Sequence, residues 1–174
     1  MKFTISLVLL LICSCRNESE QAAQVSIADP QWSSNHSVDF NREIHAREEL
    51  DIAIYLEHHK DLKMLETGSG IRYQFAENRP GQGPKAHLGD QVTVNLSIDL
   101  LDGTSCYKSD TIPDQFVLGR SDHESGLQEV IQLMRPGQKT KVIIPSYLAH
   151  GLLGDSEIIP PQSILLIDVE LISI

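Results

Sequence analysis

The side chains best suited to chemistry in this 174-residue chain are its 3 cysteines and 7 histidines. Cys106 with His123 or His150 would suggest a thiol nucleophile activated by an imidazole. No local motif around the cysteine supports that hypothesis. His58 and His59 are adjacent, so they point in different directions on a helix and do not form a metal-binding pair. The chain also has no CxxC, HExxH or phosphate-binding glycine loop, so we expect neither a metal nor a cofactor.

The first fifteen residues predict where the protein resides. Met1-Lys2 is a basic start, residues 3–12 are almost entirely apolar, and the small Ser14 precedes Cys15. This is the layout of a secretory signal peptide, and the apolar run is shorter than the about 20 residues that cross a bilayer. The junction resembles a bacterial lipoprotein signal, which implies cleavage after Ser14 and lipid on Cys15. An ordinary signal peptide with an incidental cysteine is the alternative.

The lipoprotein interpretation implies a location in the cell envelope, with the protein lipid-anchored to a bacterial membrane and facing the periplasm or the surface. The net charge of −10 and the lack of a basic patch argue against nucleic acid as a partner. The length of 174 residues suits one domain with an appendage, and the 41 % of hydrophobic residues is enough for a core. Only Cys106 would remain as a free thiol, so no intrachain disulfide is expected.

Composition divides the chain into four segments. After a signal peptide at 1–14, polar residues 15–38 predict a tether, and residues 39–67 form an N-terminal helical segment with the helix itself over 39–63. The predicted helix carries an approximate apolar stripe, which consists of Ile44, Leu50, Ala53, Ile54 and Leu62. Residues 68–174 form the main domain.

Residues in the main domain show the periodicities of strands and of one short helix. Strands are predicted over 71–76, 92–100, 115–118, 140–144 and 165–171, the second with a clear period of two. Leu127, Val130, Ile131 and Met134 lie on one face of a short helix, which Ser125 and Gln128 would begin as a capping box. The helix stripe and the strand faces must bury each other, which predicts a curved antiparallel sheet around one helix, an α+β fold.

Four local motifs from Gly89 onward resemble the FKBP-type peptidyl-prolyl cis-trans isomerases. They are Gly89-Asp90 before a strand ending in Asp102-Gly103, the run Phe116-Val117-Leu118-Gly119, the segment from Ser125 to Gln138, and Ile144 to Gly151 followed by Ile158 to Ser163. The resemblance implies an FKBP-like sheet of five to six strands. A more specific resemblance is to the gliding-motility-associated FKBP-type lipoproteins of Bacteroidetes, which share the stretches ESGL…IQLM and HGLLGD…IPPQS.

This family's reaction needs no nucleophile, metal or cofactor. Resonance opposes rotation about a peptide bond with a barrier of about 18–20 kcal/mol, and exchange at proline takes tens to hundreds of seconds. A twisted amide is less polar than a planar one, so a dry apolar pocket stabilises it selectively. The expected site is therefore an apolar hollow between the helix, the sheet and the loop from Pro145 to Pro161, able to hold a proline ring.

The resemblance carries the site over residue by residue. The pocket walls fall on Leu96, Tyr107, Phe116, Leu127, Ile159 and Ile167, with Ile158 and Ile159 on the loop above. Glu124 falls where a backbone N–H binds the substrate carbonyl, and His150 where a tyrosine hydroxyl usually donates a hydrogen bond. Among these, His150, Tyr107 and Ile159 are the expected catalytic residues.

Several positions depart from the family pattern. Lys108 stands where an aspartate is usual, Asp114 stands in place of an aromatic wall residue, and the assignment of Tyr107 needs a one-residue shift. Leu96 and Leu127 are smaller than the usual aromatic side chains, so we expect a wider pocket, reduced activity and poor binding of macrolide inhibitors.

The sequence therefore predicts a membrane-anchored isomerase that acts on proline-containing polypeptides and assists the folding of exported proteins. The alternative is a non-catalytic FKBP-like binding module or chaperone in a cell-envelope or gliding machine. The departures from the family pattern favour the module, and the retained loop from Leu148 to Pro161 favours the enzyme. A thiol hydrolase is a third hypothesis and rests only on Cys106.

Overall fold

The computed structural model describes residues 34–109 and 111–174. The predicted signal peptide, the predicted lipidation site Cys15 and most of the predicted tether lie outside these residues. The described residues begin with α1 (Ser34–His58) and continue through β1 (Leu65–Glu66), β2 (Arg72–Phe75), β3 (Gln91–Leu100), β4 (Ser105–Lys108), β5 (Asp114–Val117), α2 (Ser125–Leu133), β6 (Lys139–Ile144), the short 3-10 helix η1 (Ser146–Leu148) and β7 (Leu165–Ser173). Within the described residues, no helix is long and apolar enough to cross a membrane.

The strands form one antiparallel sheet in the order β1-β2-β6-β7-β3-β4, with β5 also paired to β3. The family resemblance predicts five to six strands, and the described residues form seven, because β1 and β4 also pair at the edges. Strand β1 has only two residues, too few to show a period of two, and the four residues of β4 are mostly exposed and do not alternate between buried and exposed positions. The long strands β3 and β7 lie side by side with Leu96 opposite Val169 and Ile98 opposite Ile167.

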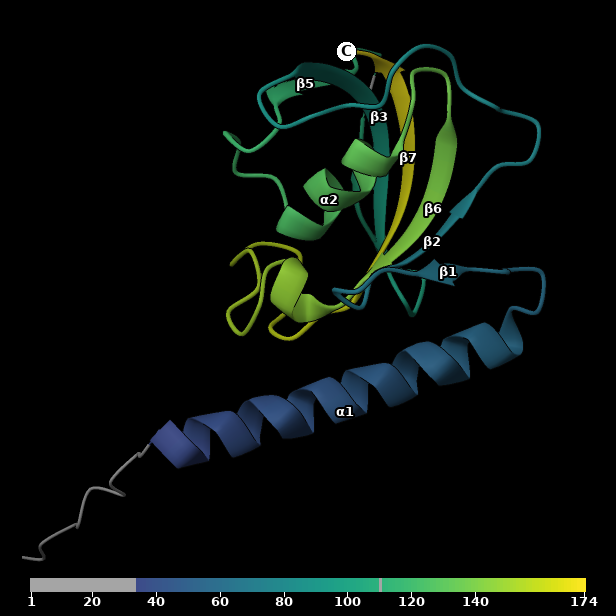
Figure 1. The fold of residues 1–174 in the computed structure, drawn as a ribbon. Helices are drawn as coiled ribbons and strands as arrows, with labels where there is room; N and C mark the ends of the chain where they lie inside the picture. The colour runs from purple at the N-terminus through teal and green to yellow at the C-terminus, as the bar shows by residue number, and fades with distance from the viewer. Residues whose placement is uncertain (1–33, 110) are drawn as a thin grey trace, which may run out of the picture. The chain divides into compact units, whose positions relative to one another are not determined.

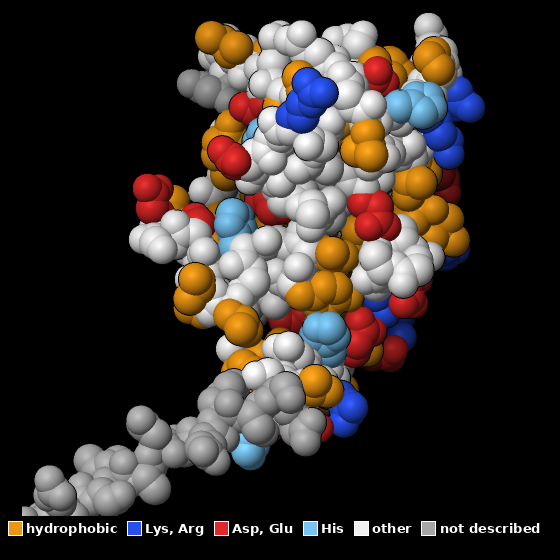
Figure 2. Space-filling model, turned by 60° about the vertical axis from the view of Figure 1, so that its left-hand side comes forward, with side chains coloured by type: hydrophobic (Ala, Val, Ile, Leu, Met, Phe, Trp, Pro, Cys, Tyr) orange, Lys and Arg blue, Asp and Glu red, His pale blue; other side chains and the backbone are white. Residues whose placement is uncertain are grey.

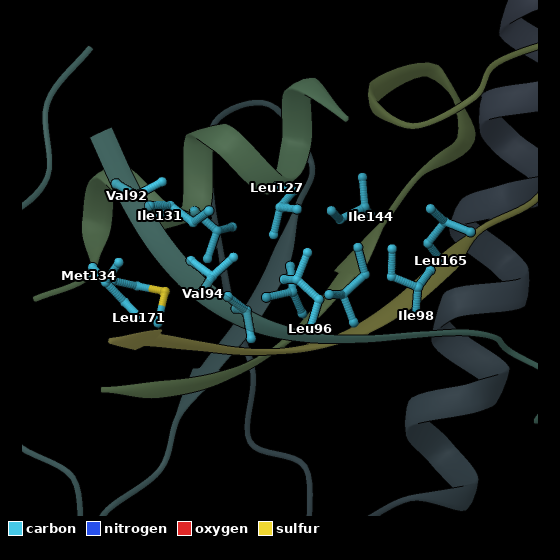
Figure 3. Close-up of a cluster of buried hydrophobic side chains, with 14 of the residues drawn as sticks. Val92, Val94, Leu96, Ile98, Leu127, Ile131, Met134, Ile144, Leu165 and Leu171 are labelled. Carbon is cyan, nitrogen blue, oxygen red and sulfur yellow. The ribbon is translucent and has the colours of Figure 1, made fainter. Parts of the chain in front are cut away.

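Helix α2 lies against one face of the sheet (Figure 1) and buries the stripe that the sequence predicts. Leu127, Val130, Ile131 and Met134 are fully buried, and Figure 3 shows their apolar partners on the sheet pointing toward the helix. The helix comes very close to β6, since a Cβ added to Gly126 would meet Ile144 Cγ2 at 2.5 Å. A glycine is therefore needed at this crossing.

The predicted capping box is wrong. The residue before the first helical turn is Glu124, with no side-chain cap, and Ser125 already belongs to the helix. Ser125 donates to the Leu148 carbonyl at 3.1 Å, while Gln128 bonds the carbonyl of His123 and the N–H of Gly119, each at 2.7 Å. Ser125 therefore bonds η1 and Gln128 bonds the loop before α2, whereas in a capping box each side chain would bond the backbone N–H of the other residue.

Helix α1 begins and ends about five residues earlier than predicted, so residues 34–38 are helical and not part of a tether. At its end, His58 and His59 each place Nδ1 2.8 Å from the carbonyl four residues before them. The buried stripe consists of Ile44, Glu48 and Ile52. Leu50 and Ile54, which the sequence assigns to that stripe, are 59 % and 49 % exposed.

Candidate functional site

The structure brings five of the six predicted pocket walls into one apolar cluster beneath α2. They come from four elements and one loop, and they are Leu96, Phe116, Leu127, Ile159 and Ile167. Figure 3 shows Leu96 on β3 and Leu127 on α2 directed toward each other. Leu127 and Ile167 have no exposed surface, and the other three are at most 8 % exposed. The side chains that the sequence assigns to the walls of a hollow are therefore packed together and almost closed to solvent in this structure.

A histidine and a carboxylate lie together on the loops around this cluster. His150 Nε2 is 3.1 Å from Glu124 Oε1, with the side chains 27 % and 5 % exposed. The other carboxylate oxygen, Oε2, is buried without a hydrogen-bond partner among the described residues. The sequence assigns Glu124 a role only through its backbone, so this side-chain contact is new.

The contact limits what His150 can do. When Nε2–H donates to Glu124, a neutral imidazole keeps Nδ1 only as an acceptor. Donation to a substrate carbonyl then requires either that the Glu124 contact opens or that the ring carries a second proton on Nδ1. In this structure, the contact with Glu124 therefore fixes the orientation of the His150 ring.

Tyr107, the sixth predicted wall, lies outside the apolar cluster. It is 42 % exposed, and its hydroxyl donates to Asp114 at 2.7 Å. This hydrogen bond raises the pKa of Tyr107, with burial adding to the shift. Ser109 donates to the other oxygen of Asp114 at 2.6 Å. Asp114, noted in the sequence as a departure, therefore organises a polar network at the edge of β5.

Cys106 packs against the apolar cluster although the sequence gives that place to Tyr107. The β3–β4 pairing shifts register between Ile98 and Asp99, where Tyr107 faces Ile98 and Ser105 faces Asp99. This shift in register places the Cys106 side chain against the apolar core. Burial raises the pKa of the Cys106 thiol, which disfavours the thiolate that a nucleophile requires.

Lys108 faces Ser97 in the ladder and lines a separate hollow of about 530 Å³ that Asp168 and Glu170 also border. Lys141 pairs with Asp168 at 2.7 Å and Lys139 with Glu170 at 3.1 Å along its walls. Of the predicted site residues only Leu96 borders this hollow.

The loop between η1 and β7 is held in shape by Asp155. Its Oδ1 accepts the backbone N–H groups of Glu157, Ile158 and Ile159 at 2.8, 2.9 and 2.8 Å. The bond from Glu157 is the main cause that lowers the pKa of Asp155, with those from Ile159 and Ile158 contributing. Gly154 is equally constrained, since an added Cβ would meet the Ile159 carbonyl at 2.1 Å.

This arrangement turns the two loop isoleucines in opposite directions. Ile159 is 6 % exposed and joins the cluster, whereas Ile158 is 54 % exposed. Figure 2 brings forward the side of the molecule on which these loops lie, where apolar and acidic side chains are interspersed. Among the described residues, no group of three or more His, Cys, Asp or Glu side chains could hold a metal ion.

The family model for FKBP-type peptidyl-prolyl cis-trans isomerases matches residues 83–172, which is 90 of the 174 residues. The chain belongs to this family, and the FKBP-like α+β fold expected from the sequence is confirmed. The crystal structure of a peptidyl-prolyl cis-trans isomerase from Pseudomonas syringae is similar, with a TM-score of 0.62 and 28 % identity. The match covers 76 % of this chain and 93 % of that one.

Two curated relatives support the same family assignment. FK506-binding protein 2 of Yarrowia lipolytica is 40 % identical over 92 residues, 52 % of this chain and 64 % of that protein. Peptidyl-prolyl cis-trans isomerase Mip of Coxiella burnetii is 34 % identical over 112 residues, 61 % of this chain and 45 % of that protein. The chain therefore spans less than two thirds of the length of either relative.

Proposed function

We propose that this protein catalyses cis–trans isomerisation of Xaa-Pro peptide bonds and thereby assists the folding of exported proteins. The observation that carries the proposal is the apolar cluster of Leu96, Phe116 and Ile159 under a loop that also holds His150. Family membership supports the same chemistry. The region combines apolar walls with a hydrogen-bonding group at the edge, as stabilisation of a twisted amide requires.

Each part of the site has a role in this reaction. The apolar walls favour the twisted amide because it is less polar than the planar form. His150 is the candidate group for fixing a carbonyl next to the rotating bond, and Glu124 orients its ring. Because the walls are at most 8 % exposed, entry of a proline ring requires these side chains to move apart.

We also propose that lipid on Cys15 anchors the protein to a bacterial membrane, with the domain on the periplasmic or outer side. The Ser14-Cys15 junction after the apolar run supports this proposal. The stretches ESGL…IQLM and HGLLGD…IPPQS support membership of the gliding-motility-associated lipoproteins. Clients would be proline-containing segments of envelope proteins.

A non-catalytic binding module is the second candidate. Two observations favour it, namely that Leu127 and Ile167 have no exposed surface and that Nε2 of His150 already contacts Glu124. A module would retain the fold and bind its partner through exposed loop side chains such as Ile158.

Isomerisation of an Xaa-Pro tetrapeptide separates the two candidates. We expect measurable kcat/KM for the wild type and a loss of at least about tenfold in a variant that combines His150→Ala with Ile159→Ala, since a hydrogen bond and an apolar wall are both removed. The matched control combines His87→Ala with Ile172→Ala, which changes the same residue types at exposed positions. A wild-type protein that does not accelerate the reaction would refute the enzyme and leave the module.

A further inference from the structure

Glu48 is an unusual residue on α1 because it carries a carboxylate and is only 2 % exposed. It accepts hydrogen bonds from the hydroxyl of Ser146 and from the backbone N–H of Ser146, the latter at 3.2 Å. Burying a carboxylate is unfavourable unless hydrogen bonds compensate for the lost water. The place where α1 buries this group is therefore informative.

Ser146 leads directly to the residues around His150. It is the first residue of η1, and its carbonyl accepts the N–H groups of Ala149 and Gly151 at 2.9 and 2.8 Å. These are the two neighbours of His150 in the chain. Glu48 thus holds the residue whose backbone fixes both sides of the candidate catalytic histidine.

Further contacts connect α1 to both ends of the same loop. His45 stacks on Tyr147 in η1 with ring centroids 4.3 Å apart. Arg47 donates to the side chain of Gln162, and the Gln162 N–H donates to the Gly151 carbonyl at 2.9 Å. Figure 1 shows α1 along the end of the domain where η1 lies.

Apolar packing holds the helix in this register. Ile52, one turn beyond Glu48, clusters with Ile143 and Ile164. Ile143 lies in β6 just before η1, and Ile164 lies just before β7, so one isoleucine of α1 packs against residues at both ends of the loop.

We infer that Glu48 is a positioning residue for the candidate site, and that α1 sets the geometry of the loop that carries His150 and Ile159. This inference rests on the proposed function, since it assigns Glu48 an effect on turnover. Helix α1 then contributes to the geometry of the site and is not only a spacer before the domain.

The test compares Glu48→Ala and Glu48→Gln with Glu49→Ala as the matched control. Glu49 is the next residue on the same helix, but it pairs with Arg72 at 2.6 Å and does not contact the loop in this way. We expect Glu48→Ala to lower kcat/KM about tenfold, the scale of a hydrogen bond to a charged group. Glu48→Gln keeps one acceptor oxygen and should recover part of the loss, while Glu49→Ala should stay near wild type.

Two further readouts distinguish positioning from a general loss of stability. The imidazole NMR signals of His150 should shift in Glu48→Ala and not in Glu49→Ala. The double variant Ser146→Ala with Glu48→Ala should lose less kcat/KM than the two single variants predict when their losses are combined. Both changes remove the hydrogen bond between the Ser146 hydroxyl and Glu48, so that loss is counted only once. Additive losses with unchanged His150 signals would overturn the inference.

Failure of this inference and failure of the proposed function give different results. A wild type that catalyses the reaction, together with Glu48→Ala at the wild-type rate, overturns the inference alone. An inactive wild type overturns the proposed function and with it the effect of Glu48 on turnover. In that case amide exchange at Ala149 and Gly151 still decides whether Glu48 holds the loop, since it should accelerate in Glu48→Ala and not in Glu49→Ala.

Discussion

Three carboxylates on three different segments hold the loops around the candidate site. Glu48 of α1 accepts from Ser146, Glu124 before α2 contacts His150, and Asp155 accepts three backbone N–H groups. An ionised carboxylate only accepts hydrogen bonds, and such bonds are stronger than those between neutral groups. The polar groups here organise the loops, which suits a reaction that depends on shape and polarity and needs no nucleophile.

Asp155 offers a test at the level of one residue. Asp155→Ala removes the acceptor shared by Glu157, Ile158 and Ile159, so we expect Ile159 to leave its buried place and kcat/KM to fall several-fold. Glu157→Ala is the control, because it changes an exposed carboxylate two residues away. NMR signals of the Ile159 methyl groups should move in the first variant and stay in the second.

The pH dependence of this loop follows from the lowered pKa of Asp155. A lowered pKa means that the folded state favours the ionised carboxylate, so its contribution is fully present above the ordinary carboxyl pKa of about 4. It is lost as the pH falls through the lowered value. Amide signals of Ile158 and Ile159 should therefore be constant at neutral pH and change only below about pH 4; a midpoint above that would contradict the assignment.

The sequence gives little warning of these carboxylates. Asp155 and Glu48 bond backbone N–H groups, which every residue except proline carries, so no residue pattern identifies the partners. The short spacing from Asp155 to Glu157 is the one usable signal, since Asp often bonds the backbone two residues on. Burial of Leu96, Phe116 and Leu127 in one cluster is easier to predict because a family motif gives their positions, while their role as walls of a site stays a prediction.

At the level of elements, the buried and exposed faces of α1 should contribute differently to the free energy of unfolding. Ile52→Ala should lower the free energy of unfolding by about 2–5 kcal/mol, the usual range for truncating a buried isoleucine, because Ile52 is 1 % exposed and packs on Ile143 and Ile164. Ile54→Ala makes the same change at a position that is 49 % exposed and should cost less than about 0.5 kcal/mol. Urea denaturation measures both, and equal costs would show that α1 is not packed in this register.

The two helices differ in how well their sequences predict their packing. In α2, Leu127, Val130 and Ile131 form an apolar face with spacing that only a helix satisfies, and all three are buried. In α1 the buried positions include the charged Glu48, so a search for apolar residues selects Leu50 and Ile54 on an exposed face. A polar residue buried for a specific contact is invisible to hydrophobic periodicity.

At the level of the whole molecule, charge and attachment must be considered together. The net charge of −10 opposes binding to the anionic surface of a bacterial membrane, and no helix among the described residues could span one. Under the anchoring proposal, lipid at Cys15 supplies the attachment, with each buried CH₂ of its chains contributing about 0.8 kcal/mol.

Cys15→Ala therefore tests the anchoring proposal. In cells that process lipoproteins, we expect the wild type in the membrane fraction and resistant to a high-salt wash, because acyl chains and not charges hold it. The Cys15→Ala protein should move to the soluble fraction or remain unprocessed without lipid. Cys106→Ala is the matched control, since it removes a cysteine that packs within the domain, and it should fractionate like the wild type. Release of the wild type by salt, or equal membrane binding and lipid content in Cys15→Ala, would show that the attachment has another origin.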